Sequence, residues 1–190
     1  RIHNKVIPDE ADLMRHLSSS FDMLIAVDTN TRVIGDQTVS ATGVVHCIAL
    51  TAPDPNSYYV KVMGHGIALF RKDLNTLPSE KCAWILVTQE INRDLRNRAR
   101  KFALVTDHDM DAHTLYNGRK TPVLGNVYLP DNFTLMYGRG DASKESILNY
   151  LIGQCDREAT KALNLIEQTG FYQHAPTKIS IDQIPMLSFT

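Results

Sequence analysis

Two short apolar runs in the chain each lead into an aspartate. Residues 23–27 are apolar without a break and precede Asp28, and the short, largely apolar run 102–106 precedes Asp107. An apolar run of this length, bounded by polar residues, is typical of a strand that is buried on both faces. We therefore expect two buried strands that are neighbours in one sheet, with both carboxylates at the same place on its edge.

The rest of the pattern alternates between strand-like and helix-like segments. Polar residues at 29–37 predict a connection after the first strand. Frequent β-branched residues or alternating polarity predict further strands at 38–50, 58–63, 123–129, 133–137 and 179–184. Helical spacing of apolar residues predicts helices at 8–20, 67–77, 79–101 and 144–168.

The helical segment 79–101 has two interpretations. Its apolar face continues without a break, which favours one long helix. The alternative is a strand at 83–88 followed by a shorter helix at 90–100. In both cases the segment lies between the two aspartate-ending runs and carries glutamates.

This order of elements predicts an α/β fold with a mixed sheet flanked by helices. A chain of 190 residues is long enough for one domain with a sizeable core and short for two. We therefore expect a single domain over residues 1–190, with its core at about 21–168 and an extended C-terminal tail at 171–190.

The charge balance limits how the protein can bind a polyanion. Lys and Arg number 20 against 21 Asp and Glu, for a formal net charge of -1. Nucleic acid would therefore have to be held by a local basic patch or through metal ions. The three cysteines are far apart and lack the spacing of a zinc or redox motif, which is typical of reduced thiols.

No segment of the sequence predicts contact with a membrane. No apolar run approaches the roughly 20 residues that a helix needs to cross a bilayer, and the N-terminus lacks the pattern of a signal peptide. We therefore expect a cytoplasmic protein. The chain begins with Arg1 rather than Met, which is typical of a piece cut from a longer chain.

Further carboxylates join the two aspartates as candidates for a site. Asp156 borders the apolar face of the final helix, where it would point at the sheet. Glu90 borders the buried face of the preceding long helix, whose first turn also holds Glu80. Asp141 lies in the loop before the final helix. Each alone is ordinarily a loop cap or a solvated helix residue, but the order of elements favours a shared site.

The order of these residues resembles that of the ribonuclease H-like superfamily of nucleases. The stretch Ile25–Asn30 looks like its first motif, Leu104–Asp107 like the strand with its second aspartate, and Gln154–Asp156 like the acid of its final helix. The resemblance covers about residues 21–168 by order of elements. It implies a ribonuclease H-like fold and a nuclease that hydrolyses phosphodiester bonds with the help of two Mg²⁺ or Mn²⁺ ions.

The resemblance implies a role for each acidic candidate. Asp28, Asp107, Asp156 and Glu90 would be catalytic, and Asp28, Asp107, Asp141 and Asp156 would be the metal ligands. Carboxylate oxygens are the ligands that these hard cations prefer. Two ions about 3.5–4 Å apart can activate a water molecule and stabilise the leaving oxygen.

Basic residues and histidines add to this picture. Arg93, Arg96 and Arg100 lie on one stripe of the predicted long helix and could follow the phosphate backbone of DNA or RNA. The alternative is a solvated helix face whose arginines lie near a C-terminus that favours cations. His108 and His113 lie in the loop after the second aspartate, where they could bind a transition metal or move a proton.

Two other functions fit the same residues. The first is a non-catalytic domain on a ribonuclease H-like fold that binds nucleic acid or another protein, since a fold does not imply an activity. The second is a PIN-like nuclease, whose opening motif resembles Asp28–Asn30, although that fold would place a helix after it. Convergence of Asp28, Asp107 and Asp156 to metal-bridging distance would favour the ribonuclease H-like nuclease, and its absence would favour the binding domain.

Overall fold

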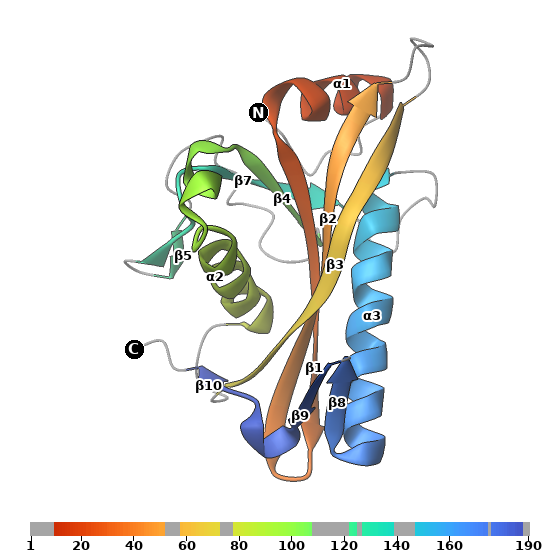
Figure 1. Ribbon diagram of the computed structural model, residues 1–190, viewed down its shortest axis with the longest axis vertical. Helices are drawn as coiled ribbons and strands as arrows, with labels where there is room; N and C mark the ends of the chain where they lie inside the picture. Colours follow the sequence, from red (N-terminus) through yellow and green to blue (C-terminus); the bar gives the residue numbers. More distant parts are fainter. Residues whose placement is uncertain are drawn as a thin grey trace.

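A six-stranded mixed sheet forms the centre of the protein (Figure 1). The computed structural model describes residues 10–51, 58–72, 78–107, 122–124, 127–138, 147–174 and 176–187. The strands of the sheet are β1 (Met23–Ile34), β2 (Gln37–Thr51), β3 (Tyr58–Lys72), β4 (Phe102–Asp107), β7 (Phe133–Gly138) and β10 (Met186–Leu187). Their order across the sheet is β10-β3-β2-β1-β4-β7.

The sheet has an antiparallel part and a parallel part. β1, β2 and β3 form an antiparallel meander. β4 runs parallel to β1, and β7 runs parallel to β4. β10 adds a short parallel pairing at Arg71 and Lys72, the end of β3. The strands that carry Asp28 and Asp107 are therefore neighbours, as expected from the two apolar runs.

Helices cover both faces of this sheet (Figure 1). α2 (Ser79–Ile91) packs on one face, and α1 (Glu10–Ser20) and α3 (Ile147–Thr169) pack on the other. α3 presents one apolar face because buried residues recur at three- and four-residue spacing. These residues are Leu148, Leu151, Ile152, Cys155, Ala159, Ala162, Leu163 and Ile166. Gly170, with φ of 76°, follows the last turn and ends the helix.

Successive residues of β1 contribute to different hydrophobic cores. Ile25 and Val27 belong to the core beneath α2, whereas Leu24 and Ala26 belong to the core beneath α1 and α3. This alternation is the period of two that a strand imposes on its side chains. A mixed sheet covered by helices on both faces confirms the α/β fold class.

β1 is longer than the strand that the apolar run at 23–27 predicted. Residues 29–34, which we expected in a connection, continue the strand, and the turn falls at Gly35, whose φ is 63°. These residues are polar because their side chains have polar partners in the fold, and not because they lie in a loop. The Thr29 hydroxyl lies 2.7 Å from that of Thr42 on β2.

The predicted helix at 67–77 is wrong. Residues up to Lys72 belong to β3, and residues 73–77 lie outside the described part of the chain. Ile67 and Leu69 pack beneath α3, whereas Phe70 is buried beneath α2. The apolar residues therefore alternate between two faces, and their helix-like spacing arises because both faces are covered.

The long helix at 79–101 is also wrong in its second half, and residues 83–88 are helical rather than a strand. α2 ends at Ile91, and a separate 3-10 helix, η1 (Leu95–Ala99), follows. At the break, the amide groups of Asn92 and Asn132 donate to each other, each at 2.9 Å. These bonds tie the end of α2 to the turn before β7.

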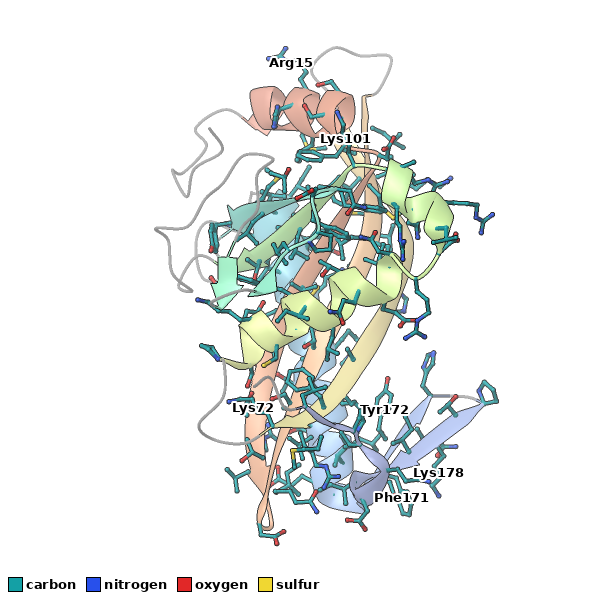
Figure 2. All side chains as sticks on the ribbon, turned by 90° about the vertical axis from the view of Figure 1, so that its left-hand side faces the viewer. Arg15, Lys72, Lys101, Phe171, Tyr172 and Lys178 are labelled. Atoms are coloured by element: carbon teal, nitrogen blue, oxygen red, sulfur yellow. The ribbon has the colours of Figure 1, made fainter. Side chains whose placement is uncertain are left out.

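The C-terminal segment is folded rather than a simple extended tail. β8 (Phe171–His174) and β9 (Thr177–Ser180) form a hairpin that leads through η2 (Ile181–Gln183) to β10. Figure 2 shows Lys178 beside Phe171, with its Nζ atom 4.2 Å from the ring centroid. β5 (Pro122–Leu124) and β6 (Val127–Tyr128) form a second small antiparallel pair. None of the helices in the described ranges combines the length and apolarity that a membrane span requires.

Candidate active site

Asp28 and Asp107 lie where β1 and β4 stop pairing. The last paired positions of these parallel strands are Ala26 and Val105. Each aspartate follows two residues later, so the two occupy equivalent positions in the register. Both are partly buried. Because side chains alternate along a strand, both share the face of Ala26 and Val105, which is the face covered by α3.

Asp156 approaches this place from α3. The Asn30 amide donates to Asp156 Oδ1 at 2.8 Å and to the Thr160 hydroxyl at 2.9 Å. One step further along both elements, two residues after Asn30 and four after Thr160, Arg32 donates to Asn164 Oδ1 at 2.6 Å; it also forms an ion pair with Glu167 at 2.7 Å. Two residues of strand and about four of helix cover nearly the same length, roughly 6–7 Å. These bonds therefore fix the position of α3 along β1.

A glycine lets α3 approach the sheet beside Asp28. Gly43 on β2 pairs with Asp28 on β1. A Cβ atom added to Gly43 would lie 2.1 Å from the backbone oxygen of Cys155, the residue before Asp156. The Cys155 thiol in turn donates to the Ala26 carbonyl at 3.3 Å. Absence of a side chain at Gly43 thus determines how close Asp156 comes to Asp28.

Glu80, in the first turn of α2, supplies a fourth carboxylate from the opposite face of the sheet. Its side chain is buried, with 6% of the residue exposed, and Thr106 donates to its Oε1 atom at 2.6 Å. Thr29 also hydrogen-bonds Glu80 through its side chain and its backbone. Thr29 and Thr106 are the chain neighbours of Asp28 and Asp107, so Glu80 is held between the two aspartate-bearing strands.

The electrostatics of Asp28 show that these four acids share one region. Burial and then the negative charges of Glu80, Asp156 and Asp107, in that order of size, raise the pKa of Asp28 to about 7. Burial likewise raises the pKa of Glu80, while its bonds to Thr106, Thr29 and Trp84 oppose the rise. Like charges raise a carboxyl pKa only when they lie close.

The donor set fits a hard divalent cation in chemistry but not in spacing. Four carboxylates offer the oxygen ligands that Mg²⁺ and Mn²⁺ prefer, and a cation would offset their repulsion. Within the described ranges, however, no three Asp, Glu, His or Cys residues lie close enough together to hold a metal ion. The convergence to metal-bridging distance that would favour a nuclease is therefore not observed among Asp28, Asp107 and Asp156.

Glu90, expected to be the acid of the helix, lies apart from these carboxylates. It is exposed and forms an ion pair with Arg93 at 2.9 Å. Ten residues of helix separate it from Glu80, which places it about 15 Å further along α2. Glu80, Trp84 and Val87 share the four- and three-residue spacing of the buried face. The prediction of Glu90 did not use this signal, which would have favoured Glu80 over Glu90.

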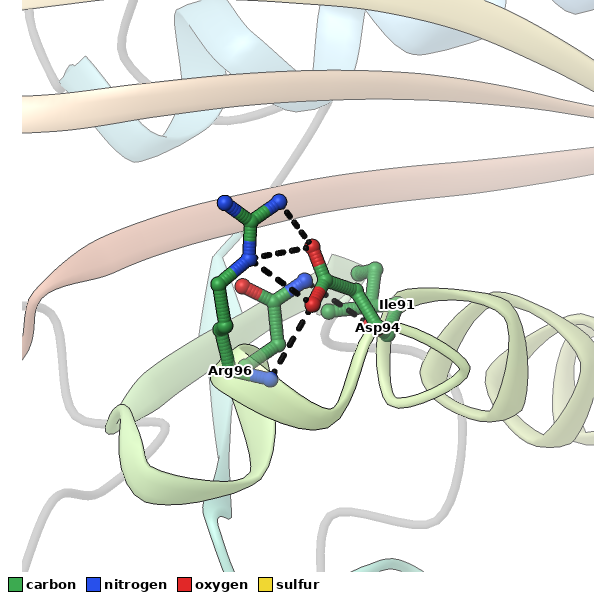
Figure 3. A network of polar contacts seen from close by, with 4 residues as sticks. Ile91, Asp94 and Arg96 are labelled. Atoms are coloured by element: carbon green, nitrogen blue, oxygen red, sulfur yellow. Dashed lines mark hydrogen bonds and ion pairs between the residues drawn. The ribbon is translucent and has the colours of Figure 1, made fainter.

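The predicted basic stripe lies at the same distant end of α2. Because the helix ends at Ile91, Arg93, Arg96 and Arg100 do not share one helical face. Arg96 is bound by Asp94, whose carboxylate it contacts at 2.8 Å, and Figure 3 shows this pair in the turn after α2. The side chains of Arg93 and Arg96 are 79% and 86% exposed, so this turn still presents basic groups to solvent.

Several predicted residues lie outside the described part of the chain. They are Asp141 in the loop before α3 and the histidines His108 and His113 after Asp107. Their expected roles as a metal ligand and as proton carriers stay predictions.

The chain is similar to a solved structure but matches no protein-family model and no curated protein sequence. Among solved structures, one described as "Solution structure of PFV RNase H domain" is similar, with 13% sequence identity and a TM-score of 0.45. The match covers 74% of this chain and 93% of that chain. The strand order and the helix placement described above are consistent with a ribonuclease H-like fold.

Proposed function

We propose that the protein is a metal-dependent nuclease that hydrolyses phosphodiester bonds of DNA or RNA. The observation that carries this proposal is the gathering of four carboxylates from four elements around the point where β1 and β4 separate. Asp28, Glu80 and Asp107 come from β1, α2 and β4, and Asp156 comes from α3. Such a concentration of negative charge is unfavourable without a cation, since each acid raises the pKa of the next.

Two Mg²⁺ or Mn²⁺ ions are the cofactor that the oxygen chemistry of this donor set favours. When bound, the ions would supply a nucleophilic water and charge stabilisation for the leaving oxygen. Asp28 and Asp107 would be the central ligands, because their backbone is fixed by the two inner strands. Asp156 and Glu80 would complete the set from opposite faces, and Glu80 replaces Glu90 in our proposal.

The exposed turn after α2 is the proposed contact for the nucleic-acid backbone. Arg93, Arg96 and Arg100 are held there on a turn closed by several hydrogen bonds. Asp94 accepts from the Arg96 backbone at 3.0 Å, and the Asn97 amide donates to the Ile91 carbonyl at 2.8 Å. A fixed basic turn about 15 Å or more from the carboxylates would contact phosphates several nucleotides from the bond to be cleaved.

The alternative is a non-catalytic domain that binds nucleic acid or another protein on the same fold. One observation favours it: among the described residues no three potential ligands are close enough for a metal ion. This alternative predicts binding without cleavage, and no change in binding when the acids are substituted. The PIN-like alternative is weakened because the chain after Asp28 continues as β1 and β2 rather than entering a helix.

A cleavage assay decides between these functions. The protein is incubated with single- and double-stranded DNA and RNA in EDTA, Mg²⁺ or Mn²⁺. We expect cleavage only with the ions, and a loss of about 10²-fold or more in Asp28→Asn, Glu80→Gln, Asp107→Asn and Asp156→Asn. Glu90→Gln is the matched control on α2 and should retain activity. Binding of the same substrates without cleavage by the wild type would reject the nuclease.

Melting curves give a second, activity-independent test. A cation that binds only the folded protein raises its stability by mass action. We expect millimolar Mg²⁺ or Mn²⁺ to raise the melting temperature of the wild type relative to EDTA, and Asp28→Asn to reduce this rise. An equal melting temperature in all three conditions would contradict a metal site at these carboxylates.

A further inference from the structure

We propose that Thr106 and Trp84 are positioning residues that hold the Glu80 carboxylate between the two aspartate-bearing strands through a chain of two hydrogen bonds. This inference rests on the proposed function of Glu80 at the site. It assigns a role to two residues that bear no negative charge and would not themselves bind a cation.

The chain of bonds is short and fully enclosed. The indole Nε1 of Trp84 donates to the Thr106 hydroxyl at 3.2 Å, and the same hydroxyl donates to Glu80 Oε1 at 2.6 Å. Trp84 is 1% exposed and Thr106 is 0% exposed. Water therefore does not compete for these groups, and each bond is stronger than it would be at the surface.

The chemistry of the three groups gives the chain one direction. An indole N–H is a donor only, so the Thr106 oxygen accepts from Trp84. The single hydroxyl hydrogen of Thr106 is then free to donate to Glu80, which accepts. The Trp84 bond thus orients the hydroxyl that in turn orients the carboxylate, and it restricts the rotation that would point the hydroxyl elsewhere.

The placement of the three residues connects this chain to the site. Trp84 follows Glu80 by four residues and lies on the same face of α2. Thr106 immediately precedes Asp107, and Thr29, the neighbour of Asp28, bonds Glu80 from the other strand. Glu80 is therefore anchored to the backbone segments that carry both aspartates.

A purely structural role does not require an acid at this position. A carboxyl that is 6% exposed loses solvation, and burial raises its pKa. A glutamine would accept the same bond from Thr106 without that cost. A buried acid with hydrogen-bond donors directed at it is the arrangement expected of a carboxylate that has a functional role.

The test uses the fact that Trp84 is the only tryptophan in the chain. Its indole N–H gives a single cross-peak in a nitrogen–proton NMR spectrum of the metal-free protein in EDTA. We expect Thr106→Val to move this peak and to speed its hydrogen exchange, while Thr106→Ser, which keeps the hydroxyl, leaves it near the wild-type position. Glu80→Gln should also move the peak, because it removes the negative charge of the group that accepts from Thr106 and also hydrogen-bonds Trp84.

Glu90→Gln is the control on the same helix and should leave the indole peak in place. The remaining backbone peaks show whether each variant is folded. An unmoved indole peak in a folded Thr106→Val or Glu80→Gln variant would overturn the proposal. This measurement needs no cation and no cleavage, so it decides the positioning role even if the nuclease proposal fails.

A kinetic measurement then separates positioning from general stability. Residues that orient metal ligands typically change metal affinity by about 10–100-fold when substituted. We expect Thr106→Val to raise the Mg²⁺ concentration for half-maximal cleavage by about tenfold, and Thr106→Ser to restore it. An unchanged Mg²⁺ dependence in Thr106→Val, with an active wild type, would overturn the positioning role. An inactive wild type would instead reject the nuclease and leave the decision to the NMR result.

Discussion

The two faces of the central sheet hold their carboxylates in different ways. Beneath α2, Glu80 is buried and bound by the neutral hydroxyls of Thr29 and Thr106. Beneath α3, Asp156 is exposed and bound by the amide of Asn30. A buried acid needs fixed donors because it has no water, whereas an exposed acid keeps much of its hydration. The α2 face is thus the rigid half of the candidate site, and the α3 face is its open half.

Gly43→Ala should cause the largest loss of stability, and it should disturb only the packing of α3 on the sheet. The new Cβ atom would lie 2.1 Å from the Cys155 carbonyl oxygen, which belongs to the backbone and can move only with the helix. We expect a loss of about 3 kcal/mol in the free energy of unfolding, the upper range for overpacking. Chemical denaturation measures this loss.

Gly64→Ala on the neighbouring strand β3 is the matched control. A Cβ atom at Gly64 would meet no heavy atom within 4 Å. Substitution of a glycine without steric conflict stabilises by about 0.4–1 kcal/mol through the unfolded state. Equal losses in both variants would show that α3 does not rest on Gly43.

The second prediction concerns the pH dependence that the buried acids create. The pKa of Asp28 in the folded protein is about 7, above its ordinary value of 3.8. The folded state therefore holds the proton more tightly than the unfolded chain. This contribution to stability is fully present below the ordinary pKa and is lost as pH rises through about 7.

Melting curves in EDTA across this range test the prediction. We expect the wild-type melting temperature to fall with rising pH by about 5 °C more than that of Asp28→Asn. Asp36→Asn, at an exposed aspartate in the turn after β1, should keep the wild-type slope. Parallel curves for the wild type and Asp28→Asn would mean that burial and the neighbouring acids do not raise the pKa of Asp28 in the folded protein.

Asn30→Ala sharpens the comparison on the open face. It removes the donor to Asp156 and Thr160 and should cost about 1 kcal/mol, because these bonds are only partly shielded from water. Arg32→Ala, which removes the ion pair with Glu167, should cost less than about 1 kcal/mol. If Asn30→Ala costs no more than Arg32→Ala, the amide does not anchor α3.

The smallest effect is expected for Glu90→Gln. Its partner Arg93 is 79% exposed, and exposed pairs three residues apart contribute about 0.2–0.5 kcal/mol. Both stability and activity should stay near the wild type, in contrast to Glu80→Gln on the same helix. A large loss of activity in Glu90→Gln would show that Glu90 belongs to the active site.

The fold class and the neighbouring aspartate-bearing strands could be predicted because buried strands have a strong apolar signature. The errors arose where both sides of an element are covered or where polar residues have polar partners. In β3, Ile67 and Phe70 lie on opposite faces, and their spacing imitates a helix. In β1, Thr29 and Asn30 imitate a loop because their partners lie on β2 and α3.

The choice between the two glutamates of α2 depended on where the helix ends. An apolar face continued through 79–101 places Glu90 in the middle of a long helix, close to the sheet. The Asn92–Asn132 pair ends the helix early, but it joins residues 40 positions apart in the sequence. A contact of that range cannot be read from local spacing, whereas the spacing of Glu80 and Trp84 could have indicated the buried acid.

The alternation along β1 also constrains how the protein can evolve. Asp28 faces α3 while Thr29 faces the opposite side, so one added or deleted residue between Leu24 and Asn30 would exchange the two sides. The side chain of Asn30 would then face the hydroxyls of β2, and that of Asp28 would turn away from the other carboxylates. Changes of length in this strand are therefore expected to be absent among functional descendants, while the turn at Gly35 and Asp36 can accept them.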